Sequence, residues 1–372
     1  MFAWIHTLRI IVLLPVVFLS FTLYAQDYTH DSLAVRAILD SNGLDAIPVD
    51  SVVDLVDNRV WRLKLNAKGL TSLPAEIGDL TNLEYLELRN NELTSLPSEI
   101  GNLAILASLE LRSNKLTDLP PEIGNLTKLS RLYLAFNNLT GLPSEIGNLV
   151  DLRVLYLFFN NLSVIPAEIG NLDKLAELDL EGNSLIGLPS EIRNCTGLRF
   201  LSLADNRITA LPSEIGDLTG LTSLHLSFNA LDDLPDAIVQ LVPVEEFDIG
   251  YNKLDTANLS DTVIAWLDEY DPDWRETQNV PVIYHPEKHG NKSIVSLNIS
   301  NASIMYTVLC ATSVKIQLYN IEGRVVSTLL DSYKEIGSGT ISLNSQRYGS
   351  GMYYIKLSAG NTSCIKKLII VK

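Results

Sequence analysis

Residues 60–254 repeat one arrangement of apolar and polar positions. In the unit that starts at Leu83, apolar residues occupy the first, fourth, sixth and eleventh positions, and the same register returns every 23 residues. A unit this short cannot bury its apolar edge alone, so we predict that nine units stack into a solenoid. The units start at Val60, Leu83, Leu106, Leu129, Leu152, Leu175, Leu198, Leu221 and Val244.

Each part of the unit predicts a different local structure. Apolar residues at the fourth and sixth positions alternate as they do in a short, half-buried strand. The Leu-Pro pair then turns the chain, because proline cannot continue a sheet, and we expect the following Glu-Ile-Gly-x-Leu stretch to form a short helical return on the outside. The ninth position is Asn in eight units and Lys68 in the first. Because an amide side chain both donates and accepts, stacked Asn residues can satisfy buried backbone groups between units.

These units resemble leucine-rich repeats of the 23-residue kind with the Leu-Pro-x-Glu-Ile-Gly signature. The resemblance covers about residues 60–254. It implies an α/β fold, a right-handed horseshoe with a parallel sheet on its concave side. It also implies a protein that recognises ligands, usually proteins or peptides, and is not itself an enzyme.

The ends of a solenoid need covers for their exposed leucines. Within residues 26–59 we expect a helical N-terminal cap that includes Asp31 to Leu39, with Asp31 or Ser32 as its N-cap. Residues 255–279 predict a C-terminal cap with a helix from Leu259 to Tyr270. We expect Trp266 and Trp274 to cover the last repeat.

The repeat ends before residue 280, and a different pattern follows. Pro281, Pro286 and Gly290 indicate a linker over residues 280–292. Residues 293–372 contain alternating segments that predict a small all-β sandwich. The predicted strands include Val314–Tyr319, Gly323–Val326, Gly351–Leu357 and Lys367–Lys372.

This last segment resembles the C-terminal sorting domain of bacterial type IX secretion. The matching runs are Leu318–Arg324, Ser350–Tyr353 and the basic and apolar finish Lys366–Lys372. The resemblance implies recognition by the secretion machinery and transport across the outer membrane of a Gram-negative bacterium, often with removal of the domain and attachment to the cell surface. The alternative is a generic immunoglobulin-like tail on a structural adhesin or spacer.

Residues 1–25 have the features of a secretory signal peptide. Arg9 is followed by an apolar run from Ile10 to Leu23, and Ala25 is the small residue before a cleavage site. The run is shorter than the roughly 20 residues that span a bilayer. We therefore expect a mature chain that begins near Gln26 and does not span a membrane.

The chain has three cysteines. Cys195 replaces a leucine of the repeat, which predicts a small buried core residue. Cys310 and Cys364 lie in the predicted sandwich, where they form either a disulfide or two buried thiols.

The formal charge of −16 at pH 7 excludes a nucleic-acid partner, because an acidic chain repels phosphate. The charge serves solubility or steers a basic partner.

The side chains that flank the core leucines predict the composition of the concave face. Early units alternate in charge, units four and five are aromatic, and unit six is acidic. An aromatic patch bordered by carboxylates is typical of a hot spot for a protein or peptide, or of a stacking platform for a glycan. A structural role at the rim is the alternative for the aromatic residues directly before the Asn, which are Phe136, Phe159, Phe228 and Tyr251. The candidate ligand-binding residues are Arg131, Tyr133, Phe136, Val154, Tyr156, Phe158, Phe159, Glu177, Asp179, Glu181 and Phe200.

Two arrangements imitate catalytic or metal sites and are rejected. Ser202, His225 and Asp248 share one column, but the amides of an open sheet are used in its hydrogen bonds and leave no oxyanion donors. His285 and His289 flank a Pro-Glu-Lys loop rather than the helical H-E-x-x-H motif of zinc proteases. We therefore predict no catalytic residue, no metal and no cofactor.

Overall fold

The computed structural model describes residues 28–242, 244–278, 295–300, 303–308, 312–320, 325–334, 337–343, 347–348, 351–359 and 362–370. The predicted signal peptide, the linker over 280–292, His285, His289 and Cys310 lie outside these residues, and so does the side chain of Cys364. The predicted disulfide therefore stays a prediction. The chain divides into two compact units, Met1–Pro281 and Val282–Lys372, and each is described by itself.

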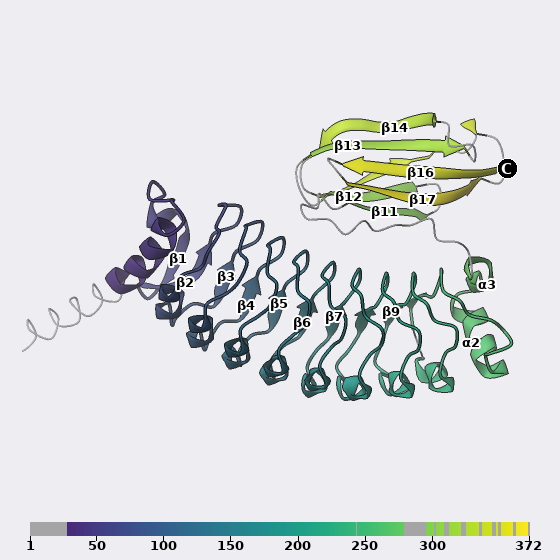
Figure 1. The fold of residues 1–372 in the computed structure, drawn as a ribbon, viewed down its shortest axis with the longest axis horizontal. Helices are drawn as coiled ribbons and strands as arrows, with labels where there is room; N and C mark the ends of the chain where they lie inside the picture. The colour runs from purple at the N-terminus through teal and green to yellow at the C-terminus, as the bar shows by residue number, and fades with distance from the viewer. Residues whose placement is uncertain are drawn as a thin grey trace, which may run out of the picture. The chain divides into compact units, whose positions relative to one another are not determined.

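The repeats of the first unit form one sheet with nine parallel strands (Figure 1). Neighbouring strands pair without a shift, so that Leu132 lies beside Leu155 and Leu155 beside Leu178. This confirms the predicted parallel sheet. The strands are β2 (Arg59–Lys64), β3 (Tyr85–Glu87), β4 (Ser108–Glu110), β5 (Arg131–Tyr133), β6 (Val154–Tyr156), β7 (Glu177–Asp179), β8 (Phe200–Ser202), β9 (Ser223–His225) and β10 (Glu246–Asp248).

A 3-10 helix forms the outer side of each complete repeat, and Figure 1 shows these helices on the opposite side of the arc from the strands. A proline precedes each helix, and its isoleucine is buried, as with Pro143 and Ile146. The helices stack so closely that a Cβ on Gly124 would lie 2.6 Å from the Glu145 carbonyl oxygen, which explains the recurrent glycine. The helices are η2 (Ala75–Asp79), η3 (Ser98–Asn102), η4 (Pro121–Asn125), η5 (Ser144–Asn148), η6 (Ala167–Asn171), η7 (Ser190–Asn194), η8 (Ser213–Asp217) and η9 (Asp236–Gln240).

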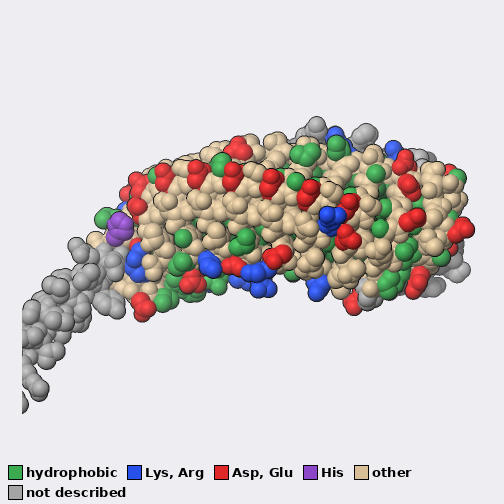
Figure 2. All heavy atoms as spheres, turned by 90° about the horizontal axis from the view of Figure 1, so that it is seen from below, with side chains coloured by type: hydrophobic (Ala, Val, Ile, Leu, Met, Phe, Trp, Pro, Cys, Tyr) green, Lys and Arg blue, Asp and Glu red, His purple; other side chains and the backbone are tan. Residues whose placement is uncertain are grey.

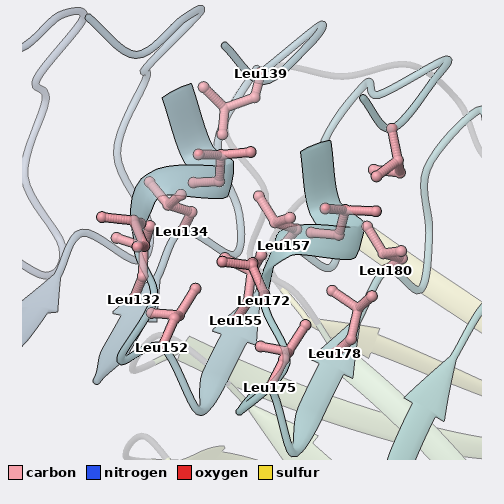
Figure 3. Close-up of a cluster of buried hydrophobic side chains, with 14 of the residues drawn as sticks. Leu132, Leu134, Leu139, Leu152, Leu155, Leu157, Leu172, Leu175, Leu178 and Leu180 are labelled. Atoms are coloured by element: carbon pink, nitrogen blue, oxygen red, sulfur yellow. The ribbon is translucent and has the colours of Figure 1, made fainter. Parts of the chain in front are cut away.

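Leucines from successive units fill the space between strands and helices (Figure 3). Leu132, Leu155 and Leu178 are each 0% exposed. Burying such a side chain contributes roughly 1.5–3 kcal/mol, so a column of them holds each unit to its neighbours.

The recurrent Asn side chains hydrogen-bond between units, as predicted. The Asn160 amide nitrogen donates to the carbonyl oxygens of Leu134 (3.0 Å) and Leu157 (2.9 Å), and its oxygen accepts from the Leu139 N–H (3.0 Å). One side chain thus satisfies three buried backbone groups in neighbouring units. We call this column the Asn ladder, and its members are Asn91, Asn114, Asn137, Asn160, Asn183, Asn206, Asn229 and Asn252.

The N-terminal cap corrects one prediction. Residues 28–40 are helical, so Asp31 and Ser32 lie inside the helix and neither is its N-cap. Asp31 is 0% exposed because its carboxylate turns inward, where it pairs with Arg59 (2.9 Å) and accepts from the Val60 N–H (2.8 Å). This buried ion pair ties the helix to the first repeat.

The cap also contains elements that the sequence analysis missed. The 3-10 helix η1 (Val49–Ser51) leads into β1 (Val53–Val56), which pairs antiparallel with β2. The two residues between these strands, Asp57 and Asn58, have positive φ angles of 47° and 63°. Such a two-residue turn favours Asp and Asn, and it lets β1 cover the edge of the repeat sheet.

The C-terminal cap has the predicted helix, α2 (Asp261–Tyr270), with Ser260 as its N-cap. The short helix α3 (Trp274–Thr277) follows it. Trp266 packs against Phe247 of β10 with ring centroids 4.7 Å apart, and the Trp274 indole N–H donates to Asp268 (2.9 Å). Both tryptophans are buried against the last repeat.

The second unit is the predicted small β-sandwich. One sheet has the order β11-β12-β15 and the other β14-β13-β16-β17, with antiparallel pairs throughout. Ile304 of the first sheet packs with Ile316 and Ile355 of the second in one core. The strands are β11 (Val295–Ser300), β12 (Ser303–Val308), β13 (Thr312–Asn320), β14 (Val325–Lys334), β15 (Gly337–Ser342), β16 (Gly351–Ala359) and β17 (Thr362–Ile370). Among the described residues of both units, no helix has the length and apolarity to span a bilayer.

Candidate binding face on the parallel sheet

The residue before each Asn of the ladder has a left-handed backbone. The φ angles at this position lie between 53° and 67° in all nine repeats, and only one of the nine residues is glycine. This conformation is uncommon for side chains larger than Asn or Asp. The residues are Ala67, Asn90, Ser113, Phe136, Phe159, Gly182, Asp205, Phe228 and Tyr251.

Five aromatic side chains of the fourth and fifth repeats meet on the concave face, and we call them the aromatic cluster. They are Tyr133, Phe136, Tyr156, Phe158 and Phe159. Ring centroids are 5.5 Å apart for Tyr133 and Tyr156, 4.9 Å for Phe136 and Phe158, and 5.2 Å for Phe136 and Phe159. All five are half-buried. The structure therefore brings together the aromatic residues that the sequence predicted to be neighbours.

Gly182 makes room for one end of the aromatic cluster. A Cβ at Gly182 would lie 2.4 Å from the Phe159 ring, and the φ angle of 67° is itself unfavourable for other residues. The ring of Phe159 therefore covers the backbone of the sixth repeat. Phe136 and Phe159 stack with only 12° between their planes, so each ring covers a face of the other.

Arg112 borders the other end of the cluster. Its guanidinium carbon lies 4.8 Å from the centroid of the Tyr133 ring, and its Nε donates to Glu110 (2.8 Å). Such a cation–π contact contributes about 0.5–1 kcal/mol at a partly exposed site. The repeat pattern did not predict this contact, although Arg112 and Tyr133 occupy neighbouring repeats in adjacent columns.

Carboxylates border the cluster on the side of the sixth repeat. Glu177 accepts a hydrogen bond from the Tyr156 hydroxyl, and burial together with this bond raises the pKa of Tyr156. Asp179 lies beside Tyr156 in the register of β6 and β7. Burial raises the pKa of Asp179 to about 6, while a hydrogen bond from the Glu181 N–H (3.1 Å) acts in the opposite direction. Asp179 is thus a poorly solvated carboxylate.

A shallow pocket of about 190 Å³ lies next to the cluster over β3, β4 and β5. Tyr133 belongs both to the pocket and to the aromatic cluster, so the two features are continuous. The residues that line the pocket are Asn66, Tyr85, Leu86, Glu87, Arg89, Ser108, Glu110 and Tyr133.

The other predicted site residues lie outside the aromatic cluster. Arg131 and Val154 are paired in the register of β5 and β6, next to Tyr133 and Tyr156. Glu181 is half-buried beyond Asp179. Phe200 contacts the ring of His225 (5.6 Å) rather than the aromatic cluster.

The residues of the rejected triad do not form one. His225 Nε2 lies 2.9 Å from the Ser223 hydroxyl and 3.9 Å from Glu246, both outside the column that contains Ser202 and Asp248. The Ser223 hydroxyl donates to Glu246 (3.0 Å), so its proton is directed away from the histidine. Within the described residues, no three His, Cys, Asp or Glu side chains are grouped to hold a metal ion.

Cys195 is a buried core residue. Its thiol donates to the Ile169 carbonyl oxygen (3.2 Å), and burial raises its pKa to about 12. A thiol with such a pKa is not a nucleophile at neutral pH.

Most of the chain matches known protein families. Residues 44–184 match a leucine-rich repeat region, residues 174–195 a leucine-rich repeat, and residues 196–240 a pair of leucine-rich repeats. Residues 292–371 match the secretion system C-terminal sorting domain. Among curated proteins, no match was found.

Several solved structures are similar to the repeat region. A leucine-rich-repeat protein of Leptospira interrogans is 43% identical with a TM-score of 0.49, and the match covers 50% of this chain and 47% of that one. The ectodomain of the Arabidopsis thaliana receptor kinase GASSHO1/SCHENGEN3, in complex with Casparian strip integrity factor 2, is 33% identical with a TM-score of 0.50 and coverage of 55% and 27%. An internalin of Listeria monocytogenes is 26% identical with a TM-score of 0.43 and coverage of 64% and 72%.

The match therefore spans about half of the Leptospira protein and about a quarter of the plant ectodomain. The tail directs the chain through type IX secretion to the outer surface or the extracellular space of a Gram-negative bacterium. The chain is a secreted leucine-rich-repeat protein that ends in a secretion system C-terminal sorting domain.

Proposed function

We propose that the exported protein binds a protein or peptide ligand on the concave face of its repeats, with the aromatic cluster at the centre of the contact. The observation that carries this proposal is the cluster itself. Five half-buried aromatic rings on two adjacent repeats touch one another, although leucines already fill the core beneath them. Exposed aromatic groups of this kind anchor protein interfaces.

The ring geometry favours a peptide over a glycan. A sugar stacks on an exposed ring face. In the cluster, Phe136 and Phe159 cover each other, Phe159 also covers Gly182, and Arg112 lies over Tyr133. These contacts occupy ring faces on which a sugar would stack, whereas the apolar side chains of a peptide can also pack against ring edges.

Two further observations support ligand binding over a role as a spacer. The plant ectodomain that is 33% identical was solved in complex with Casparian strip integrity factor 2. A spacer needs only the leucine core and a soluble surface. The acidic side chains that run in a row along the helix side of the repeats, which Figure 2 shows, already provide solubility. The aromatic cluster adds exposed apolar area that solubility does not require.

Substitution of two cluster residues tests the proposal. A displayed library of random 12-residue peptides is sorted on the full-length chain, and the enriched peptides are measured against variants. Tyr156→Ala with Phe158→Ala should weaken binding at least 100-fold, because central aromatic anchors commonly contribute about 2 kcal/mol each. The thermal midpoint should stay nearly unchanged, since neither ring enters the leucine core.

The matched control uses the other aromatic stack of the same face. Phe228 and Tyr251 stack with centroids 4.4 Å apart in the eighth and ninth repeats. Replacing both with alanine should leave peptide binding unchanged. Equal binding of the enriched peptides to the wild type and to the Tyr156 and Phe158 variant would move the site away from the concave centre.

A further inference from the structure

The concave face has opposite charges toward its two ends. At the third, fifth, seventh and eighth positions of the repeat, which flank the core leucines, the repeats of β2–β5 carry three more basic than acidic residues. The repeats of β6–β10 carry six acidic residues and no lysine or arginine at these four positions, while Arg153 and Arg199 lie at the second position, directly before β6 and β8. The basic residues are Arg62, Lys64, Arg89, Arg112 and Arg131, against Glu87 and Glu110; the acidic residues are Glu177, Asp179, Glu181, Asp205, Glu246 and Asp248. The aromatic cluster lies between the two regions.

Not all of the basic residues are neutralised within the chain. Arg62 pairs with Glu87, Lys64 with Asp54 and Arg112 with Glu110. The ion pairs of the described residues include neither Arg89 nor Arg131, and both side chains are half-buried. Arg89 also lines the pocket beside the cluster. A carboxylate that enters this pocket would meet a guanidinium that the chain leaves unpaired.

Two carboxylates beside the cluster, Glu177 and Asp179, form no ion pair with a described residue. Glu177 accepts from the neutral Tyr156 hydroxyl, and Asp179 accepts from the Glu181 N–H. The pKa of Asp179, raised to about 6 by burial, shows that its charge is poorly solvated. A basic side chain of a ligand would supply the missing charge beside the Tyr156 ring.

We propose that the ligand is an extended peptide segment with an acidic and a basic side chain, which binds with its carboxylate over β3–β5 and its basic group over β7. This proposal rests on the proposed function and adds the chemistry and the direction of the ligand. Strands β3 and β7 are four strand spacings apart, or about 19 Å at about 4.8 Å each. An extended chain covers about 3.4 Å per residue, so the two charges lie about six residues apart, with apolar residues between them on the aromatic cluster.

Two synthetic peptides of equal composition test this polarity with the full-length chain. The first is acetyl-Asp-Gly-Leu-Tyr-Leu-Gly-Lys-amide, and the second has its Asp and Lys side by side at one end. Binding is measured by fluorescence anisotropy at low ionic strength. The first peptide should bind at least tenfold more tightly, because only it can pair both charges while covering the rings. Equal affinities, or no binding of the first peptide, would overturn the proposal.

Photo-cross-linking then determines the direction in which the peptide lies along the concave face. A benzophenone next to the peptide lysine should label β7 and β8, and one next to the aspartate should label β3–β5. The reverse pattern, or equal labelling of both regions, would also overturn the polarity.

Substitutions of charged residues and of aromatic residues distinguish failure of the charge polarity from failure of the proposed binding at the aromatic cluster. Asp179→Asn should weaken binding of the first peptide several-fold but leave binding of its Lys-to-norleucine analogue unchanged. Arg89→Gln should likewise weaken binding of the first peptide but leave binding of its Asp-to-Asn analogue unchanged. If Tyr156→Ala with Phe158→Ala abolishes binding of both peptides while these charge effects are absent, the aromatic site stands and the polarity fails. If the aromatic substitutions have no effect on either peptide, the proposed function fails.

Discussion

Asp179 is a carboxylate in an environment that opposes its charge. Its pKa is raised to about 6 by burial, whereas an aspartate in an unfolded chain has a pKa of about 3.9. The folded state therefore binds the proton more tightly than the unfolded state. Asp179 therefore lowers the free energy of unfolding as the pH rises from about 4 to above 6. This destabilising contribution of its charge is complete at neutral pH.

Asp179→Asn should therefore stabilise the protein at neutral pH. A shift of two pKa units corresponds to about 3 kcal/mol, and partial solvent exposure reduces the expected gain to about 1 kcal/mol. Urea unfolding at pH 7.5 and at pH 4.5 measures this gain, which should be clearly smaller at the lower pH. An equal gain at both pH values would show that packing, not charge, accounts for the effect.

Asp151 provides a control of opposite sign. Hydrogen bonds and ion pairs with Lys174 and Lys128 lower the pKa of Asp151. Its contribution is present above the unfolded pKa and is lost as the pH falls through the folded pKa. Asp151→Asn should accordingly give a small loss of stability at pH 7.5 that disappears in acid.

Repeat register predicted the neighbours on the concave face but not their conformations. The 23-residue spacing places Tyr133 beside Tyr156, and the structure agrees. The hydrogen bond from Tyr156 to Glu177 and the packing of Arg112 over Tyr133 depend on side-chain rotamers, which the alignment of the repeats does not specify. The left-handed backbone at Phe136 was also missed, although Asn90 and Gly182 in the same column are residues that favour it.

The Asn ladder connects the strands of one repeat to those of the next. Asn160 makes three hydrogen bonds to backbone groups that have left water. Removal of the amide leaves buried donors and acceptors without partners, and each costs about 1–3 kcal/mol. The ladder therefore stabilises the stack as much by avoiding this penalty as by the bonds themselves.

Asn160→Ala should lower the free energy of unfolding by about 3 kcal/mol or more. The neighbouring Asn161 is exposed, and Asn161→Ala is the matched control, with an expected change below about 0.5 kcal/mol. Urea unfolding followed by far-UV circular dichroism measures both. Similar losses from the two substitutions would show that the side-chain bonds of the ladder contribute little.

Elements that belong to the repeat were predictable, and those outside it were less so. The strands and 3-10 helices follow from nine copies of one apolar pattern. The strand β1 belongs to no repeat, and its four residues are too few to show the apolar and polar alternation of a strand. The sequence feature that could have predicted β1 is the Asp57-Asn58 pair, because these residues favour a two-residue turn between antiparallel strands. Asp31 was wrongly predicted as an N-cap because the sequence does not show that Arg59 draws its carboxylate inward.

The described residues form two separate hydrophobic cores. One extends from Ala34 in the N-terminal cap to Trp274 in the C-terminal cap, and the other joins the two sheets of the sandwich. Because caps cover the apolar ends of the repeats, the solenoid has the features of a unit that folds without the sandwich. Export and the proposed ligand binding can therefore be tested separately by changes in different units.

Deletion of residues 293–372 should leave a folded repeat domain that accumulates in the periplasm. The sorting domain lies within the deleted part, since its family match covers residues 292–371. Cell fractionation and protease treatment of intact cells would measure the location, and far-UV circular dichroism the fold. The matched control is the full chain with Tyr156→Ala and Phe158→Ala, which should reach the surface as the wild type does because its tail is intact. Surface display of the truncated chain would show that export depends on the repeats rather than on the sandwich.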